Sequence, residues 1–154
     1  MKQLALQIAT LGPIGRILPA PGTFGSLVAV ILGYFILSAG WFWLAIATLI
    51  ALITGIWASS VYESYAQKKD ASEVIIDEVA GQWSVLLVAP LSFEGFIAAF
   101  LLFRLFDIFK PFPINKADAI EGGIGVMADD MVAGFFAGVV LIALMLSGII
   151  TPIL

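Results

Sequence analysis

The sequence contains no cysteine and no histidine. Without cysteine there are no disulfide bonds and no thiol nucleophile, and without either residue zinc sites of the usual ligand types are excluded. Acid–base catalysis by histidine is excluded as well. Any chemistry must use carboxylates, lysine, arginine, hydroxyl groups, the backbone and an added metal ion.

Charged residues are also scarce. They make up 12% of the 154 residues, and hydrophobic residues make up 62%. Soluble domains are about 25% charged and about 45–50% apolar. The composition therefore predicts one domain over residues 1–154 that is embedded in a lipid bilayer. The net charge of −4 argues against nucleic acid as a partner, and no pattern points to a particular oligomeric state.

The few charges are clustered along the chain. Lys2 and Arg16 precede the first apolar run, most others lie in segments 63–78 and 104–130, and Glu94 stands apart. The uncharged runs between these clusters are candidates for membrane-spanning segments.

The first and last uncharged runs predict three membrane helices, since a spanning helix needs roughly 20 residues. The first run, 17–62, predicts a helical hairpin with arms 27–37 and 41–62 and a turn at Gly40. The first arm is short for a span, so Ser26 is a candidate for its start. The last run, 131–154, predicts one further span.

The middle run, 79–103, permits two interpretations because it contains Glu94. A single span would bury this carboxylate at high cost. A hairpin with arms 77–89 and 93–109, turning at residues 90–92, would leave it in water.

The positive-inside rule favours the hairpin. A single span divides the seven basic residues almost evenly between the two sides, whereas the hairpin places all seven on one side. We therefore expect an all-α integral membrane protein with about five membrane helices, namely two helical hairpins and a C-terminal span. Residues 1–16 do not resemble a signal peptide and predict a short amphipathic helix at the interface. The N-terminus and three charged segments then lie at the cytoplasmic face.

Four blocks at this face carry the chemistry: PGTFGSL (21–27), IIDEVAGQW (75–83), FRLFDIFKPFPI (103–114) and GGIGVMADD (122–130). In the first block, the two glycines Gly22 and Gly25 would allow backbone N–H groups to approach a ligand. Thr23 and Ser26 could bind an anion at a helix N-terminus. An ordinary capped helix start is the alternative interpretation.

The second and third blocks combine acidic and basic side chains. Asp77 and Glu78 are expected in the first turn of a helix, where they either complement the helix dipole or bind a metal ion. Arg104, Asp107 and Lys110 are expected along one side of a helix end that stops at the next proline. Pro113 is expected to hold the segment after this helix extended. The arginine and the aspartate could form only a structural ion pair, but ionisable residues at membrane depth usually serve a function.

The fourth block places Asp129 and Asp130 at the expected start of the last span, after a flexible glycine-rich loop. Helix-dipole complementation explains one carboxylate, and a divalent cation would relieve the repulsion between two. Small residues at 133–138 could let this helix pack closely against the arm that carries Asp77 and Glu78. Together the blocks favour metal-assisted phosphoryl chemistry on an amphiphilic phosphate.

The same four blocks, in order and spacing, resemble the phosphatidylglycerophosphatase A family over about residues 12–140. The resemblance implies a Mg²⁺-dependent phosphatase of the bacterial inner membrane, multi-pass, with its active site at the cytoplasmic face. It would hydrolyse phosphatidylglycerophosphate to phosphatidylglycerol and phosphate. Some members have histidine where this chain has Glu121, so that acid–base role is unavailable here.

The resemblance implies a set of site residues, to which we assign hypothetical roles. The metal ligands would be Asp77, Glu78, Asp129 and Asp130. The residues that bind the substrate phosphate would be Thr23, Gly25, Ser26, Arg104 and Lys110. The catalytic residues would be Asp107, Arg104, Lys110 and Asp130.

Two other functions are consistent with a small membrane protein rich in carboxylates. A lipid phosphotransferase of the CDP-alcohol type would need a DGxxAR…GxxxDxxxD pattern, which is absent. A small ion-coupled transporter would need a carboxylate near the bilayer midplane, and only Glu94 qualifies, if the middle run is a single span.

Overall fold

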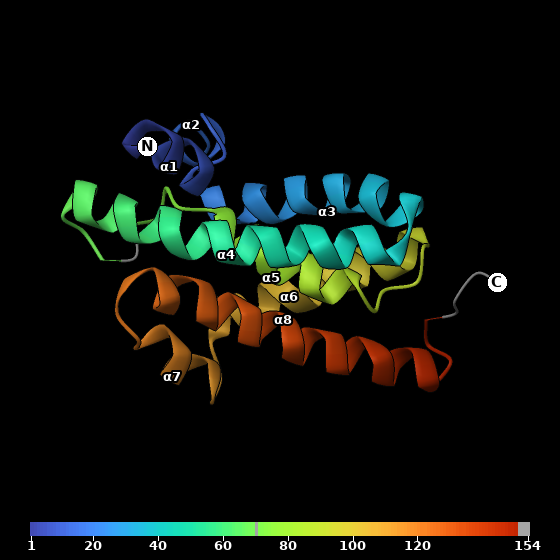
Figure 1. Cartoon of the computed structure of the whole chain (residues 1–154). Helices are drawn as coiled ribbons and strands as arrows, with labels where there is room; N and C mark the ends of the chain where they lie inside the picture. The colour runs from blue at the N-terminus through green and yellow to red at the C-terminus, as the bar shows by residue number, and fades with distance from the viewer. Residues whose placement is uncertain (70, 151–154) are drawn as a thin grey trace.

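The structure is a computed structural model, and it describes residues 1–69 and 71–150. These residues form helices and no strands: α1 (Lys2–Ala9), α2 (Ile14–Ile17), α3 (Pro21–Ala39), α4 (Trp41–Ala66), α5 (Ile76–Leu86), α6 (Phe93–Phe109), α7 (Ile114–Asp118) and α8 (Gly122–Leu146). The predicted all-α class is confirmed for this part of the chain. Figure 1 shows α3, α4 and α8 running side by side along the length of the molecule.

The first predicted hairpin is present. Helices α3 and α4 are antiparallel and are joined at Gly40, whose φ of 135° suits glycine. Helix α3 begins at Pro21, two turns before the predicted arm, because proline is well tolerated at the first helical position. Ser26, considered as a possible start of this arm, therefore lies inside the helix.

The middle segment is also broken into two helices, as the hairpin interpretation predicted. Helix α5 ends at Leu86, and α6 begins after Ser92, whose side chain accepts a hydrogen bond from the Gly95 N–H as an N-cap. Glu94 is exposed in the first turn of α6. The single-span interpretation is therefore wrong, and the carboxylate that it would have buried in a helix lies at a turn.

The predicted number of five spans is not shown. Within the described residues, three helices are long and apolar enough to cross a membrane: α3, α4 and α8. The 11 residues of α5 rise only about 16 Å at 1.5 Å per residue, against a hydrocarbon core of about 30 Å. The first turn of α5 carries Asp77 and Glu78, and a loop follows Leu86 up to Pro90.

The last helix begins earlier than the sequence predicted. Helix α8 runs from Gly122, so the glycine-rich segment is helical and Asp129 and Asp130 lie two turns inside the helix. Complementation of the helix dipole, which acts over the first turn, therefore does not explain them. The span was predicted to reach Leu154, but residues 151–154 lie outside the described residues.

The N-terminal helix predicted for residues 1–16 is shorter than expected. Helix α1 ends at Ala9 and packs on α4 through Ala5, Leu6 and Ala9. The backbone then turns at Gly12, whose φ is 68°, before the single turn of α2. The Ile75 N–H donates to the Ala9 carbonyl at 2.8 Å, which ties this region to the start of α5.

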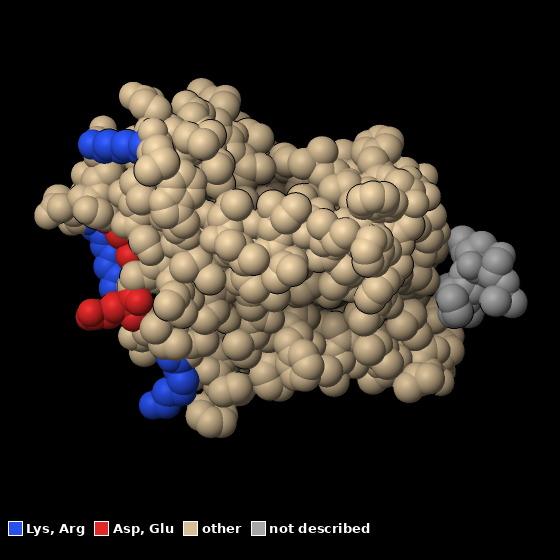
Figure 2. Space-filling model, viewed as in Figure 1, with Lys and Arg blue, Asp and Glu red and all other residues tan. Residues whose placement is uncertain are grey.

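Charged side chains gather at one end of the molecule. Figure 2 shows Lys, Arg, Asp and Glu at one end of the visible face and only uncharged side chains over the rest of it. We call this the polar end; the starts of α3, α5 and α8 and the end of α6 meet there. The hairpin turns at Gly40 and at residues 87–92 lie at the opposite end, where the Trp41 indole donates to the Leu87 carbonyl at 3.0 Å.

Candidate active site

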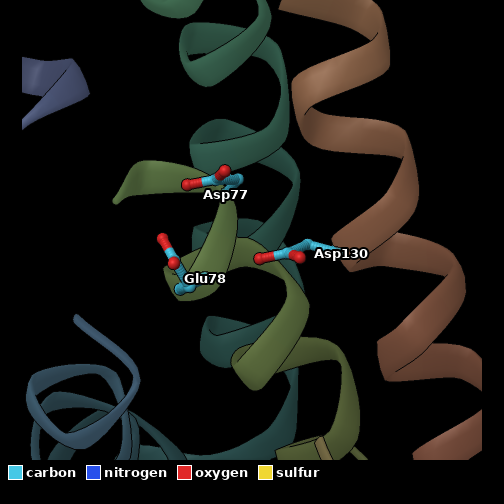
Figure 3. A group of neighbouring side chains, drawn as sticks. All are labelled: Asp77, Glu78 and Asp130. Carbon is cyan, nitrogen blue, oxygen red and sulfur yellow. The ribbon is translucent and has the colours of Figure 1, made fainter. Parts of the chain in front are cut away.

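Three carboxylates from two helices meet at the polar end. One oxygen each from Asp77, Glu78 and Asp130 lies within 4.8 Å of the other two. Figure 3 shows Asp130 reaching from α8 towards α5, which carries Asp77 and Glu78 in its first turn. The sequence predicted this juxtaposition, and the structure brings these three residues together.

Helix α5 is held in this position from both sides. The Trp83 indole donates to the Ala29 carbonyl of α3 at 2.8 Å. On the other side, α5 packs on α8 so closely that a Cβ on Gly81 would lie 2.7 Å from the Asp130 carbonyl oxygen and one on Gly134 2.1 Å from the Ser84 hydroxyl oxygen. The predicted small-residue contact between these helices is therefore confirmed.

Asp129 does not join the three-carboxylate cluster. Its carboxylate accepts a hydrogen bond from the Lys110 ammonium at 2.6 Å, and the same ammonium forms an ion pair with Asp118 of α7. Adjacent residues on a helix point about 100° apart, because 3.6 residues complete a turn, so Asp129 and Asp130 face different neighbours. The pairing with Lys110 uses one carboxylate oxygen of Asp129, and the other is buried without a hydrogen-bond donor, so the role of Asp129 as a metal ligand stays a prediction.

Lys110 carries a stable positive charge between two carboxylates. Its partial burial alone would lower the pKa of Lys110, but the hydrogen bonds and negative charges of Asp118 and Asp129 outweigh it and raise that pKa well above its usual value. The hydrogen bond from Lys110, the largest influence, lowers the pKa of Asp118 despite the opposing effect of burial. The ammonium therefore remains charged across the physiological pH range.

Arg104 links α6 to both other parts of the site. Its Nη1 atom lies 2.5 Å from the Asp107 carboxylate and 3.8 Å from that of Glu78. It also donates to the Ser26 hydroxyl at 3.4 Å, and that hydroxyl donates to the Gly22 carbonyl at 2.9 Å. The predicted helix end is confirmed, since α6 stops at Phe109 before Pro111.

The exit from α6 differs from the prediction. We expected Pro113 to hold an extended segment, but residues 111–113 form a turn with a cis bond between Phe112 and Pro113. This turn leads directly into α7, which brings Asp118 back to Lys110.

The first block contributes less direct contact than predicted. Thr23 lines the pocket described below, but Gly25 and Ser26 do not. Gly25 is buried against Ile75, where an added Cβ would lie 3.0 Å from the isoleucine Cβ, so its backbone is not open to a phosphate. Ser26 is fully buried and acts on Arg104 instead. The hypothesis of direct phosphate contact is therefore corrected for these two residues.

A polar pocket of about 340 Å³ connects these side chains. Its lining includes Ala20, Gly22, Thr23, Asp77, Glu78, Arg104, Asp107, Ile108, Lys110, Asp129 and Asp130. Two lining residues have a left-handed backbone without being glycine: Ala20, with φ of 55°, and Lys110, with φ of 41°. Such strained residues cluster at functional sites.

The donor set fits a divalent cation. Asp77, Glu78, Asp129 and Asp130 each have one buried carboxylate oxygen without a hydrogen-bond donor. Unpaired buried carboxylates are costly, and carboxylate oxygens are the ligands that Mg²⁺ prefers. Asp77, Glu78 and Asp130 would therefore hold such an ion.

Sequence reasoning missed two residues near the site, Asp118 and Gln82, and gave Gly22 a role different from the one that the structure shows. Asp118 lies in a short helix that the sequence did not predict, and its pairing with Lys110 depends on the turn after α6. Gly22 is required by close packing, because an added Cβ would lie 2.1 Å from a Glu78 oxygen. Gln82 is fully buried with neither amide atom hydrogen-bonded, one helical turn after Glu78. Its place in the block DEVAGQW was the available signal.

The fold and the site together define an apolar helical protein of the membrane class with a pocket of carboxylates and basic side chains at one end. The chain belongs to the phosphatidylglycerophosphatase A family, whose family model matches residues 7–145. Its relatives are phosphatases by name, and the chain is accordingly an enzyme of this kind.

Three relatives illustrate the similarity. A phosphatidylglycerophosphatase A of Haemophilus influenzae is 40% identical over 133 residues, 84% of this chain and 82% of the relative. A phosphatidylglycerophosphatase A of Escherichia coli is 31% identical over 123 residues, which are 79% of this chain and 72% of the relative. A protein of Bacteroides thetaiotaomicron with the provisional name phosphatidylinositol-3-phosphatase is 42% identical over 126 residues, 77% and 79% of the two chains. No solved structure matches this chain.

Proposed function

We propose that this protein is a Mg²⁺-dependent phosphatase that hydrolyses the terminal phosphomonoester of phosphatidylglycerophosphate to phosphatidylglycerol and phosphate. The observation that carries the proposal is the cluster of Asp77, Glu78 and Asp130 beside the Arg104 guanidinium in one pocket. The family supports the activity and the substrate. The donor set supports the cation, since hard carboxylate oxygens suit Mg²⁺.

The basic side chains would bind and orient the phosphate. Arg104 has a buried Nε without a partner, and Lys110 holds its charge beside Asp129 on the pocket wall. Both cations would offset negative charge that is spread over the phosphoryl oxygens in the transition state. Thr23, which also lines the pocket, would add a hydroxyl to this set.

The carboxylates divide into two groups in this proposal. Asp77, Glu78 and Asp130 would hold Mg²⁺, which supplies charge neutralisation at the phosphate and lowers the pKa of water. Asp107 lines the pocket outside this cluster, so we assign it the role of general base for the attacking water. It orients that water and accepts one proton as the new P–O bond forms and the ester P–O bond breaks. A proton then passes to the leaving glycerol oxygen, so one water is consumed for each phosphate released.

The remaining parts of the proposal concern location. The protein would lie in the bacterial inner membrane with its polar end at the cytoplasmic face. Three apolar helices and the gathering of charges at one end support this arrangement. Helices α5 and α6 would then form the second membrane hairpin.

The proposal predicts Mg²⁺-dependent phosphate release from phosphatidylglycerophosphate by the purified protein. Excess EDTA should abolish the activity, and Asp130→Asn, Asp107→Asn and Arg104→Ala should each lower kcat/KM by at least about 100-fold, the scale of loss when a transition-state contact is removed. The measurement is inorganic phosphate released per minute from defined lipid in mixed micelles.

The matched control is Glu94→Gln, which removes an exposed carboxylate at the opposite end of the molecule and should retain wild-type activity. Phosphatidylinositol 3-phosphate should be assayed in parallel, because one relative carries that name. Faster hydrolysis of that lipid, or activity unaffected by EDTA, would contradict the proposal.

A further inference from the structure

A second and larger hollow lies between α3 and α6, on the side of the bundle where these helices meet. We call it the α3–α6 groove. Its volume is about 640 Å³, and its walls include Leu27, Ile31 and Phe35 from α3 and Phe93, Phe96 and Phe100 from α6. The lining is almost entirely apolar, and nothing in the phosphatase chemistry described above uses it.

The groove continues the polar pocket along the same faces of the same two helices. On α3, the pocket residue Thr23 is followed at four- and eight-residue spacing by Leu27 and Ile31. Residues with this spacing lie on one face of a helix. The groove therefore starts one turn beyond the pocket on the α3 side.

Helix α6 shows the same continuity in the opposite direction. The pocket residue Arg104 is preceded at four-residue spacing by Phe100 and then by Phe96. Because α3 leaves the polar end and α6 returns to it, both walls run from the pocket towards the turn at residues 87–92.

The groove extends over most of one leaflet. From Leu27 to Phe35 the α3 wall spans eight residues, which is about 12 Å at 1.5 Å per residue, and the pocket at Thr23 lies one turn before it. Half of a hydrocarbon core of about 30 Å is about 15 Å. An acyl chain that hangs from a headgroup at the interface covers that distance.

We propose that the α3–α6 groove holds an acyl chain of the lipid whose phosphate lies in the polar pocket. The inference rests on the proposed function for the identity of the headgroup, and it adds the path of the chain. Transfer of a chain from lipid to an apolar groove gains little hydrophobic free energy, since lipid tails are as apolar as the groove. The groove acts instead by orienting the lipid so that its phosphate meets Arg104.

The first test fills the groove. Ile31→Trp and Ile97→Trp place bulk inside it, and Leu32→Trp on α3 and Ile53→Trp on α4 place the same bulk on exposed positions outside it. The assay compares kcat/KM for phosphatidylglycerophosphate with long chains and with six-carbon chains. The long-to-short ratio should fall about tenfold in the groove variants, as expected when a reacting group is displaced, and should not change in the controls. Equal effects in both pairs would overturn the proposal.

The second test needs no catalysis and no variant. Phosphatidylglycerophosphate that carries a photoreactive diazirine in one chain is irradiated with the protein, and the labelled peptides are identified by mass spectrometry. Label should concentrate in residues 27–35 and 91–100, and phosphatidylcholine with the same chain should not compete for it. Label spread over all lipid-facing helices would show ordinary annular lipid and overturn the proposal.

The two proposals fail in distinguishable ways. If the wild type releases no phosphate from phosphatidylglycerophosphate, the proposed function is wrong, and the labelling pattern still decides whether the groove holds a chain. If the wild type is active and the label is diffuse, only the groove proposal is wrong.

Discussion

At the scale of single residues, the pair Asp129 and Asp130 shows how a helix separates neighbouring charges. The sequence suggested that a cation relieves the repulsion between them. In the structure Lys110 already pairs with Asp129, and only Asp130 faces Asp77 and Glu78. The two carboxylates therefore have different partners, and their substitution should have different consequences.

Removal of the Asp130 carboxylate should abolish stabilisation by Mg²⁺. The wild-type protein in detergent should unfold at a higher temperature when Mg²⁺ is added, because a ligand at 100 times its Kd stabilises the folded state by about 2.7 kcal/mol. Asp130→Asn should lose this increase and, without Mg²⁺, should be no less stable than the wild type, since one of three like charges is gone. Differential scanning fluorimetry measures both.

The control for this prediction is Glu121→Gln, an exposed carboxylate just before α8. It should keep the full Mg²⁺-dependent increase. An unchanged increase in Asp130→Asn would show that the cation binds elsewhere.

The pairing of Lys110 with Asp118 should tune activity without holding the fold together. Both side chains are partly exposed, so Asp118→Asn should cost about 1 kcal/mol of unfolding free energy or less. The pKa of Asp118 is lowered in the folded protein. The ion pair therefore stabilises the fold at pH values above the pKa of Asp118 in the unfolded chain, about 3.9. This stabilisation is lost as the pH falls through the lower pKa of the folded state. Denaturant titrations of wild type and Asp118→Asn at several pH values measure this.

The corresponding kinetic comparison uses Lys110→Met, with Lys116→Met at an exposed position of α7 as its control. Lys110→Met should lower kcat/KM about 100-fold or more, Asp118→Asn only severalfold, and Lys116→Met not at all. Equal losses in Lys110→Met and Lys116→Met would mean a general effect of surface charge.

At the scale of elements, the packing of α5 on α8 positions the carboxylate cluster. Asp77 and Glu78 come from one helix and Asp130 from the other. The helix backbones approach closely at Gly81 and Gly134, where side chains would collide with the partner helix. The small residues were visible in the sequence, but their partners across the interface were not.

Gly134→Ala should therefore separate α5 from α8, whereas Gly138→Ala should be tolerated. A Cβ on Gly134 would lie 2.1 Å from the Ser84 hydroxyl oxygen and 2.5 Å from the Gly81 carbonyl oxygen, while one on Gly138 would meet only Val88 at 3.4 Å. Overpacking of this kind costs about 1–3 kcal/mol. Thermal unfolding in detergent and Mg²⁺-dependent activity should both decline for the first variant alone.

At the scale of the whole molecule, the two hairpins bring four distant segments to one end. The positive-inside argument predicted this arrangement from seven basic residues, and the charges do gather at the polar end. The prediction of five full spans went further than the structure supports, because α5 is too short to cross the bilayer by itself.

Single-cysteine variants can map this topology, because the chain has no native cysteine. Lys68→Cys and Lys116→Cys, both at exposed positions, should react with a membrane-impermeable maleimide from the cytoplasmic side only. Glu94→Cys should react from the opposite side if α5 and α6 cross the membrane. Protection of Glu94→Cys from both sides would mean a re-entrant hairpin, and reaction of the two lysine positions from opposite sides would contradict the fold.

The sequence by itself determined the class of structure and the composition of the site. Apolar runs and scarce charges specify helices in a membrane, because helix formation in a membrane depends on the local sequence pattern. The acidic and basic blocks specify which side chains meet at one end of the molecule, because this depends only on the side of the membrane on which each block lies. Tertiary structure alone decided which carboxylate faces which partner. That outcome depends on helix phase, on the early start of α8 at Gly122 and on the turn that returns Asp118 to Lys110, and small shifts in where a helix begins rotate every side chain that follows.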